Sequence, residues 1–140
     1  MKYFTLPLIA LSTFAFTGCV EREAADAKLV KGCEAAILAF SDEGDKVGAI
    51  NKQTITDHAK QGPGHREVKL DVTITDGFHG RDESHSCIFY EQFGMFKSTH
   101  NASIYQLNYF GKIIGKDGFD IHGSVEEMQK LTDAVDKALR

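Results

Sequence analysis

The sequence predicts an α+β fold: an N-terminal helix, an antiparallel sheet of three to four strands and a C-terminal helix, arranged as a two-layer sandwich with one disulfide. Three observations lead to this prediction. Apolar residues recur at helical spacing over residues 24–40 and again after Ser124, whereas residues 66–75 alternate strictly between apolar and polar side chains. Short connections between the expected strands favour an antiparallel meander with both helices on one face.

The first helix is expected over residues 24–40. Leu29, Cys33 and Ile37 form one apolar stripe along it. Residues 41–48 are polar and rich in Gly, which ends the helix. Because Cys33 lies on the apolar stripe, we expect the helix to face the strand that carries Cys87.

Three strands are expected in the middle of the chain, over residues 66–75, 85–93 and 101–110. In the first, apolar side chains at even positions and polar side chains at odd positions indicate a sheet with one buried face and one face in water. The intervening residues 76–84 are expected to form a loop. Residues 112–115 either continue the third strand or begin a fourth.

The period of two also assigns side chains to faces of the sheet. It places Cys87 and Phe89 on one face, and it places Tyr105 and Leu107 together on one face of the third strand. Residues 44–65 have no clear pattern and fit a short strand or an ordered loop.

The second helix is expected after Ser124. Ser124 is a favourable N-cap residue, and Glu127 stands three residues later, which is the capping-box pattern. Leu131 and Val135 continue an apolar stripe at helical spacing. This helix is therefore expected to pack on the same sheet.

Residues 1–18 are typical of a secretory signal, with a positive start and an apolar core at residues 6–16 that is too short to span a bilayer as a helix. The segment FTGC, residues 16–19, resembles a bacterial lipobox, in which an apolar residue, a small residue and Gly or Ala precede a cysteine. The resemblance implies a diacylglycerol on the Cys19 thiol, cleavage before Cys19 and acylation of the new amino terminus, for example with palmitate. Phe16 departs from the pattern, which usually has Leu there.

Two alternatives remain for the leader: ordinary cleavage after Ala15 or Gly18, and retention of the apolar run as an anchor. The lipobox resemblance implies a lipidated Cys and short tether over residues 19–28 and one domain over residues 29–140. It also implies an exported membrane lipoprotein that faces the periplasm. In enteric bacteria an Asp after the cysteine favours retention in the inner membrane, so Val20 favours the outer membrane.

The chain has three cysteines, Cys19, Cys33 and Cys87. An exported protein rarely leaves one thiol over. Lipidation of Cys19 resolves the odd number, because Cys33 and Cys87 then form one disulfide. The alternative is a pair of separate buried thiols in a reducing compartment.

The formal charge of −4 excludes attraction to nucleic acid by bulk charge. The expected partners are instead the membrane, through the lipid anchor, and a protein of the cell envelope. We expect no cofactor.

Histidines are the residues most suggestive of a metal site. His79 and His85 flank a short loop that contains Asp82, and imidazole and carboxylate groups of this kind bind Zn²⁺ or Cu²⁺. Their spacing matches no established metal motif, and the alternative is that they are solvated loop side chains.

No catalytic motif is present. His85 and Cys87 share a strand face, so a Cys–His dyad is geometrically possible, but the disulfide uses the same sulfur. The expected strands hold more aromatic side chains than one face needs, among them Tyr90 and Tyr105. Such residues fill the space between sheet and helices or, alternatively, bind a partner or ligand.

These observations predict a lipid-anchored envelope protein that works without catalysis, as a binding or assembly-support module. Two alternatives remain. One is a periplasmic metal-binding protein that uses His79, His85 and nearby carboxylates, and the other is a small hydrolase.

Overall fold

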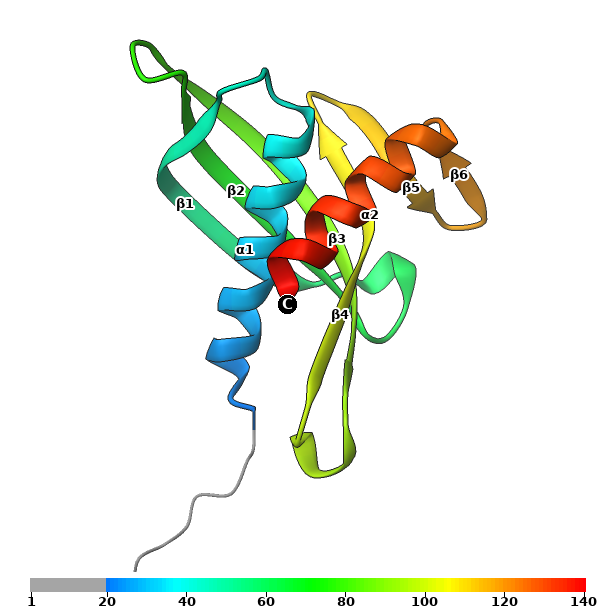
Figure 1. Ribbon diagram of the computed structural model, residues 1–140. Helices are drawn as coiled ribbons and strands as arrows, with labels where there is room; N and C mark the ends of the chain where they lie inside the picture. Colours follow the sequence, from blue (N-terminus) through cyan, green and yellow to red (C-terminus); the bar gives the residue numbers. More distant parts are fainter. Residues whose placement is uncertain (1–19) are drawn as a thin grey trace, which may run out of the picture.

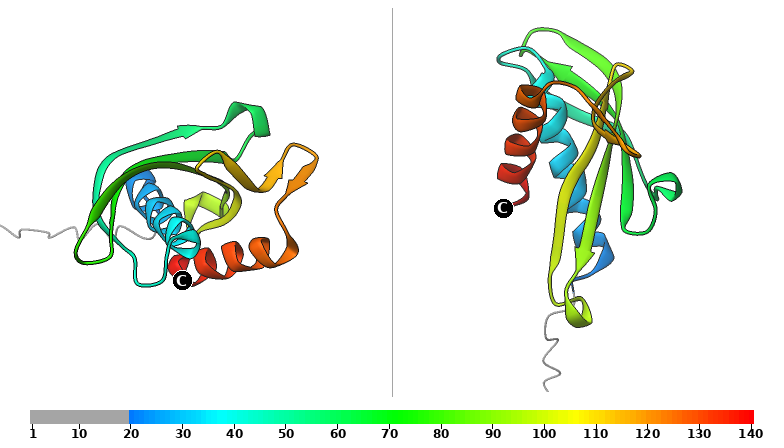
Figure 2. Two further views of the ribbon diagram at one scale, coloured as in Figure 1. Left: turned by 90° about the horizontal axis from the view of Figure 1, so that it is seen from above. Right: turned by 90° about the vertical axis from the view of Figure 1, so that its right-hand side faces the viewer.

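The computed structural model describes residues 20–140, so the expected signal and Cys19 lie outside the described residues. Two helices cover one face of a six-stranded antiparallel sheet (Figure 1). The sheet curves around α1 (Arg22–Phe40), and α2 (Val125–Leu139) packs beside α1 (Figure 2). The predicted α+β class is confirmed. Within residues 20–140, no helix is long and apolar enough to cross a membrane.

The strands follow one another across the sheet in sequence order, each antiparallel to its neighbour. They are β1 (Lys46–Asp57), β2 (His65–Thr75), β3 (Gly80–Phe93), β4 (His100–Tyr109), β5 (Lys112–Asp117) and β6 (Asp120–His122). Short 3-10 turns, η1 (Ala59–Gln61) and η2 (Met95–Lys97), follow β1 and β3.

The prediction of three to four strands is wrong, because the sheet has six. The strand β1, for which the sequence leaves a short strand or a loop open, lies at the edge of the sheet, and its side chains are almost all exposed, so no apolar alternation marks its full length. Backbone pairing with β2 holds it in place. The strand β6 has only three residues, which is too short for a visible period.

Two further boundaries differ from the prediction. Residues 80–84, expected in a loop, begin β3 and pair with the end of β2. The first helix, expected from residue 24, begins at Arg22, so it includes most of the residues expected to form a tether, and Ala25 is only 1% exposed. In both places most side chains are polar, so the sequence shows no apolar period that would predict this part of the helix or of the strand.

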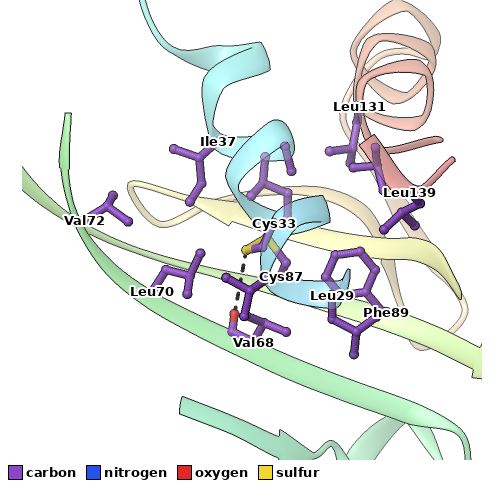
Figure 3. Close-up of a cluster of buried hydrophobic side chains, with 14 of the residues drawn as sticks. Leu29, Cys33, Ile37, Val68, Leu70, Val72, Cys87, Phe89, Leu131 and Leu139 are labelled. Carbon is purple, nitrogen blue, oxygen red and sulfur yellow. Dashed lines mark hydrogen bonds between the residues drawn. A yellow bond between two sulfur atoms is a disulfide. The ribbon is translucent and has the colours of Figure 1, made fainter. Parts of the chain in front are cut away.

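The core lies between α1, α2 and the face of the sheet that they cover, which we call the inner face. The apolar side chains at even positions of β2 all point into this core, as the alternation predicted. Figure 3 shows how the two helices and the strands contribute to it. Its fully buried side chains include Leu29, Ile37, Val68, Leu70, Val72, Ile74, Phe89, Leu107 and Val135.

The predicted disulfide between Cys33 and Cys87 is present, and it joins the middle of α1 to the middle of β3 (Figure 3). The two α-carbons are 5.7 Å apart, and both residues are fully buried. The bridge spans 54 positions of sequence, so it removes a large amount of freedom from the unfolded chain.

The predicted capping box at the start of α2 is also confirmed. The Glu127 amide donates to the Ser124 hydroxyl at 3.1 Å, and the Ser124 amide donates to the Glu127 carboxylate at 2.9 Å. These two bonds satisfy two amides that the first turn of a helix otherwise leaves unpaired.

We predict that the double substitution Cys33→Ala/Cys87→Ala lowers the free energy of unfolding by about 4 kcal/mol at most, because it restores the entropy of a long loop in the unfolded chain. Urea denaturation followed by circular dichroism measures this loss. The control Cys19→Ser, which changes a thiol outside the bridge, should leave the midpoint unchanged. An unchanged midpoint in the double variant would show that the bridge does not hold the fold.

Candidate functional site

The outer face of the sheet, which points away from the helices, carries a cluster of three aromatic rings. His65 of β2 pairs directly with Tyr90 of β3, so both side chains lie on the same face. The imidazole centroid is 5.0 Å from the Tyr90 ring and 4.7 Å from the Tyr105 ring. The Tyr105 ring meets the imidazole edge-on, which is a favoured arrangement for aromatic pairs.

A β-bulge brings Tyr105 into this cluster. The register between β3 and β4 shifts by one residue after Ile88, so Tyr105 is an extra residue on β4. The prediction that Tyr105 and Leu107 share a face is therefore wrong. Leu107 is buried in the core, whereas Tyr105 lies beside His65 on the other side of the sheet.

A cavity of about 400 Å³ opens beside these rings. β5 pairs with β4 only over residues 106–109. The cavity lies next to the part of β4 that has no paired neighbour on the β5 side. Its lining combines an imidazole, two phenols, a hydroxyl, an ammonium group and two apolar side chains. These residues are His65, Tyr90, Ser103, Ile104, Tyr105, Lys116 and Met128.

Two neighbouring hollows share residues with this cavity. One, of about 410 Å³, is lined by His65 together with the end of β1 and the loop that follows it. The other, of about 100 Å³, shares Tyr90 and Ser103 and extends along β3 and β4. We call the three hollows together the His65 groove.

Hydrogen bonds between distant segments hold the rim of the groove. The loop that follows β1 reaches the β5–β6 turn, where the Gln61 amide donates to the Asp117 carboxylate and accepts from the Gly118 amide, both at 3.2 Å. The Tyr105 hydroxyl donates to the Gly118 carbonyl at 3.2 Å. The loop, the turn and the bulge are therefore fixed relative to one another.

The geometry also assigns roles to the polar groups of the groove. The Nδ1 atom of His65 lies 3.2 Å from the Gly62 carbonyl, which can only accept, so Nδ1 carries a proton. In the neutral ring Nε2 is then left as an acceptor, and in the charged ring it donates. Lys116 adds a positive charge, and the cavity lining contains no carboxylate. This arrangement suits an anion that carries a flat apolar part, since the tyrosine rings offer surfaces for stacking.

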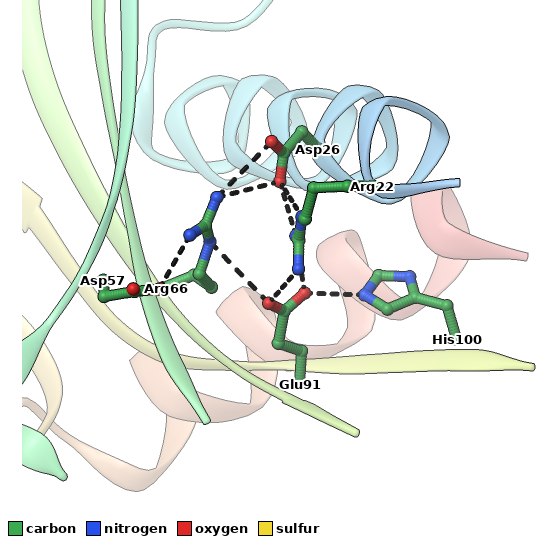
Figure 4. A network of polar contacts seen from close by, with 6 residues as sticks. All are labelled: Arg22, Asp26, Asp57, Arg66, Glu91 and His100. Carbon is green, nitrogen blue, oxygen red and sulfur yellow. Dashed lines mark hydrogen bonds and ion pairs between the residues drawn. The ribbon is translucent and has the colours of Figure 1, made fainter. Parts of the chain in front are cut away.

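A network of charges closes one end of the inner face (Figure 4). The Glu91 carboxylate, 5% exposed, accepts from Arg22 at 2.6 and 2.9 Å and from His100 Nε2 at 2.8 Å. Arg66 approaches the same carboxylate at 3.7 Å and also pairs with Asp26 at 3.2 Å. The hydrogen bonds that Arg22 donates to Glu91 and then to Asp26 raise the pKa of Arg22 in spite of its partial burial. These contacts tie the start of α1 to β2, β3 and β4.

A second Glu–His pair closes the other end. The carboxylate of Glu83 accepts from His85 Nε2 at 2.7 Å and from Arg81 at 2.5 Å. The His85 ring stacks on Tyr109 with centroids 4.6 Å apart. Hydrogen bonds to Asp45 and then to Glu83 raise the pKa of Arg81. Glu83 and His85 are therefore buried at the edge of the core and do not line any of the three hollows of the His65 groove.

The three metal candidates do not come together. His79 is an exposed residue of the β2–β3 turn and lies 3.8 Å from Asp76. Asp82 accepts from Thr73 at 2.6 Å on the outer face, whereas His85 is buried on the inner face. In the described part of the chain, no group of three or more His, Cys, Asp or Glu side chains is placed to hold a metal ion. Cys87 shares the inner face with His85 as expected, but its sulfur is in the disulfide.

The groove residues differ from the candidates that the sequence suggested. The surplus of aromatic residues in the strands was the one available signal, and it includes Tyr90 and Tyr105. Nothing in the pattern distinguished His65 from the other histidines. Lys116 belongs to the groove only because β5 turns back beside β4.

We predict that Gly115→Ala destabilises the fold by about 3 kcal/mol or more, because Gly115 has a φ of +113° and an added Cβ would lie 2.4 Å from the Tyr105 carbonyl oxygen. The matched control Gly118→Ala has a φ of +64° and open space around the Cβ, so it should cost only about 1 kcal/mol. Urea denaturation of both variants measures the difference. Equal losses of unfolding free energy in the two variants would show that Gly115 of β5 is not in close contact with the bulge at Tyr105.

Comparison of the chain with protein-family models, with curated proteins and with solved structures finds no match of any kind.

Proposed function

We propose that this protein is a lipid-anchored, periplasm-facing protein of the cell envelope that works by binding at the His65 groove, without catalysis. The observation that carries the proposal is the cavity of about 400 Å³, whose lining brings an imidazole, a hydroxyl and an ammonium group together with two tyrosine rings. Met128 of α2 and Ile104 of β4 form the apolar part of its lining, and the remaining lining residues come from β2 to β5.

The proposed anchor rests on the lipobox-like segment before Cys19. The disulfide between Cys33 and Cys87 uses the two other cysteines and is compatible with export. Lipidation of Cys19 would thus give every cysteine of the chain a chemical role.

The proposed ligand is an anion with a flat apolar part. The ammonium group of Lys116 attracts the negative charge, and the rings of Tyr90 and Tyr105 contact the flat part. The His65 imidazole contacts both tyrosine rings and adds a hydrogen-bonding nitrogen.

We predict that a naphthalenesulfonate probe binds in the groove and that Lys116→Met weakens its binding by about tenfold or more, because one hydrogen bond to a charged group is lost. The matched control Lys52→Met changes an exposed lysine of β1 that is outside the cavity lining and should leave the affinity unchanged. Isothermal titration calorimetry measures the affinities.

A neutral naphthalene alcohol separates charge recognition from stacking. Its binding should not change in Lys116→Met but should weaken in Tyr105→Leu. Equal effects of Lys116→Met and Lys52→Met on the sulfonate would contradict the proposed site, as would the absence of any binding.

We predict that Cys19→Ser moves the protein from the membrane fraction to the soluble periplasmic fraction of the cell, because the thiol that receives the lipid is gone. Fractionation followed by detection of the protein measures this shift. A substitution at the neighbouring Val20, Val20→Ala, is the control and should leave the protein with the membrane. A Cys19→Ser variant that stays with the membrane although its intact mass shows that the leader has been removed would exclude lipidation as the anchor.

A further inference from the structure

The turn between β3 and β4 presents two large apolar side chains to the surroundings. Met95 is 81% exposed and Phe96 is 87% exposed, and Lys97 follows them. We call these three residues the hairpin tip. Scattered apolar residues are common on protein surfaces, but two adjacent ones at the end of a projecting hairpin need a further reason.

The backbone of the tip is held in a conformation that such residues rarely adopt. Phe96 and Lys97 both have a φ of 56°, in the left-handed region that favours Gly. Strain of this kind persists where the surrounding structure enforces it, and it is found preferentially at functional positions.

The tip lies next to the point where the lipid would be attached. The Val20 amide donates to the Lys97 carbonyl at 2.8 Å, and Cys19 is the residue that precedes Val20. Val20, the first residue that the structure describes, therefore contacts the tip, and in the sequence it directly follows the cysteine that would carry the lipid. Figure 1 shows the start of α1 and the β3–β4 hairpin at the same end of the molecule.

The start of α1 and the hairpin are also held together by side chains. Arg22 donates to Glu91 of β3 at 2.6 and 2.9 Å (Figure 4). Its guanidinium also lies 5.3 Å from the centre of the Phe93 ring. His100 of β4 donates to the same carboxylate at 2.8 Å. These contacts fix the orientation of the hairpin relative to the anchored end of the chain.

We infer that the hairpin tip inserts into the membrane that holds Cys19, with Met95 and Phe96 among the acyl chains and the Lys97 ammonium at the level of the lipid phosphates. Lysine suits that place because its charged end reaches the headgroups while its stem remains in apolar surroundings. The inference rests on the proposed lipid anchor. Insertion of the tip would fix the orientation of the domain on the bilayer. The β2–β3 turn, at the far end of β3, would then point away from the bilayer.

The absence of tryptophan from the chain makes a direct test possible. The variant Phe96→Trp places a single reporter at the tip. The matched control Phe78→Trp places one at the β2–β3 turn, where Phe78 is 91% exposed. The core cluster of the described residues lies between Leu29 and Leu139, so we expect a chain that begins at Cys19 to keep the fold. With Cys33 and Cys87 in the disulfide, the Cys19 thiol alone is free to couple to a maleimide phospholipid in vesicles with brominated acyl chains.

On coupled vesicles we expect the emission of the Phe96→Trp variant to shift to shorter wavelength and to be quenched by bromine, and that of the Phe78→Trp variant to show neither effect. Equal emission of the two variants on the vesicles would overturn the inference. A concentration-dependent shift of the Phe96→Trp emission without vesicles would overturn it too, because the tip would then be an interface between two copies of the chain.

The chemical coupling separates this test from the test of the anchor. Attachment of Cys19 to lipid in the vesicles does not depend on lipidation in the cell, which the fractionation of Cys19→Ser decides. Failure of the anchor therefore appears in the cell fractions, and failure of the tip appears in the emission of the coupled protein.

Discussion

The position of α1 across the inner face of the sheet is the constraint on which the rest of the structure depends. The disulfide between Cys33 and Cys87 fixes the middle of the helix over the middle of β3. Next to it, an added Cβ on Gly32 would lie 3.0 Å from Leu139 of α2 and 3.1 Å from Phe89 of β3. A side chain at this position would require Leu139 and Phe89 to shift, so the place of α2 also depends on α1.

Fixing the middle of α1 also places its two ends. Its first turn reaches Glu91 on β3, where two arginines and a histidine surround one buried carboxylate. The residue that follows its last turn, Ser41, lies near Tyr109, which stacks on His85. The apolar core is thus closed by a Glu–His pair at each end. Buried carboxylates of this kind are tolerated because hydrogen bonds and opposite charges compensate their loss of water.

The two faces of the sheet consequently differ in their roles. The inner face carries the core and the charged pairs, which account for stability. The outer face is left free of helices, and the bulge at Tyr105 moves an aromatic ring from the inner to the outer side. One extra residue in β4 therefore creates the wall of the groove without disturbing Leu107 behind it.

Local patterns predicted the parts of the fold that depend on local physics. The alternation of residues 66–75 gave β2 and its buried face, Ser124 and Glu127 gave the start of α2, and the number of cysteines gave the disulfide. The sequence could not decide between a strand and a loop for β1, because an exposed edge strand is stabilised by backbone pairing that leaves no apolar signature. The groove could not be seen either, because it depends on a register shift and on the return of β5.

The measurement that tests the account most directly is the intact mass of the mature protein extracted from its own membrane, alkylated with and without prior reduction. The expected mass is that of a chain starting at Cys19 with acyl chains attached, in which Cys33 and Cys87 are alkylated only after reduction. A mass without lipid, or alkylation of either residue without reduction, would contradict an anchored and exported protein.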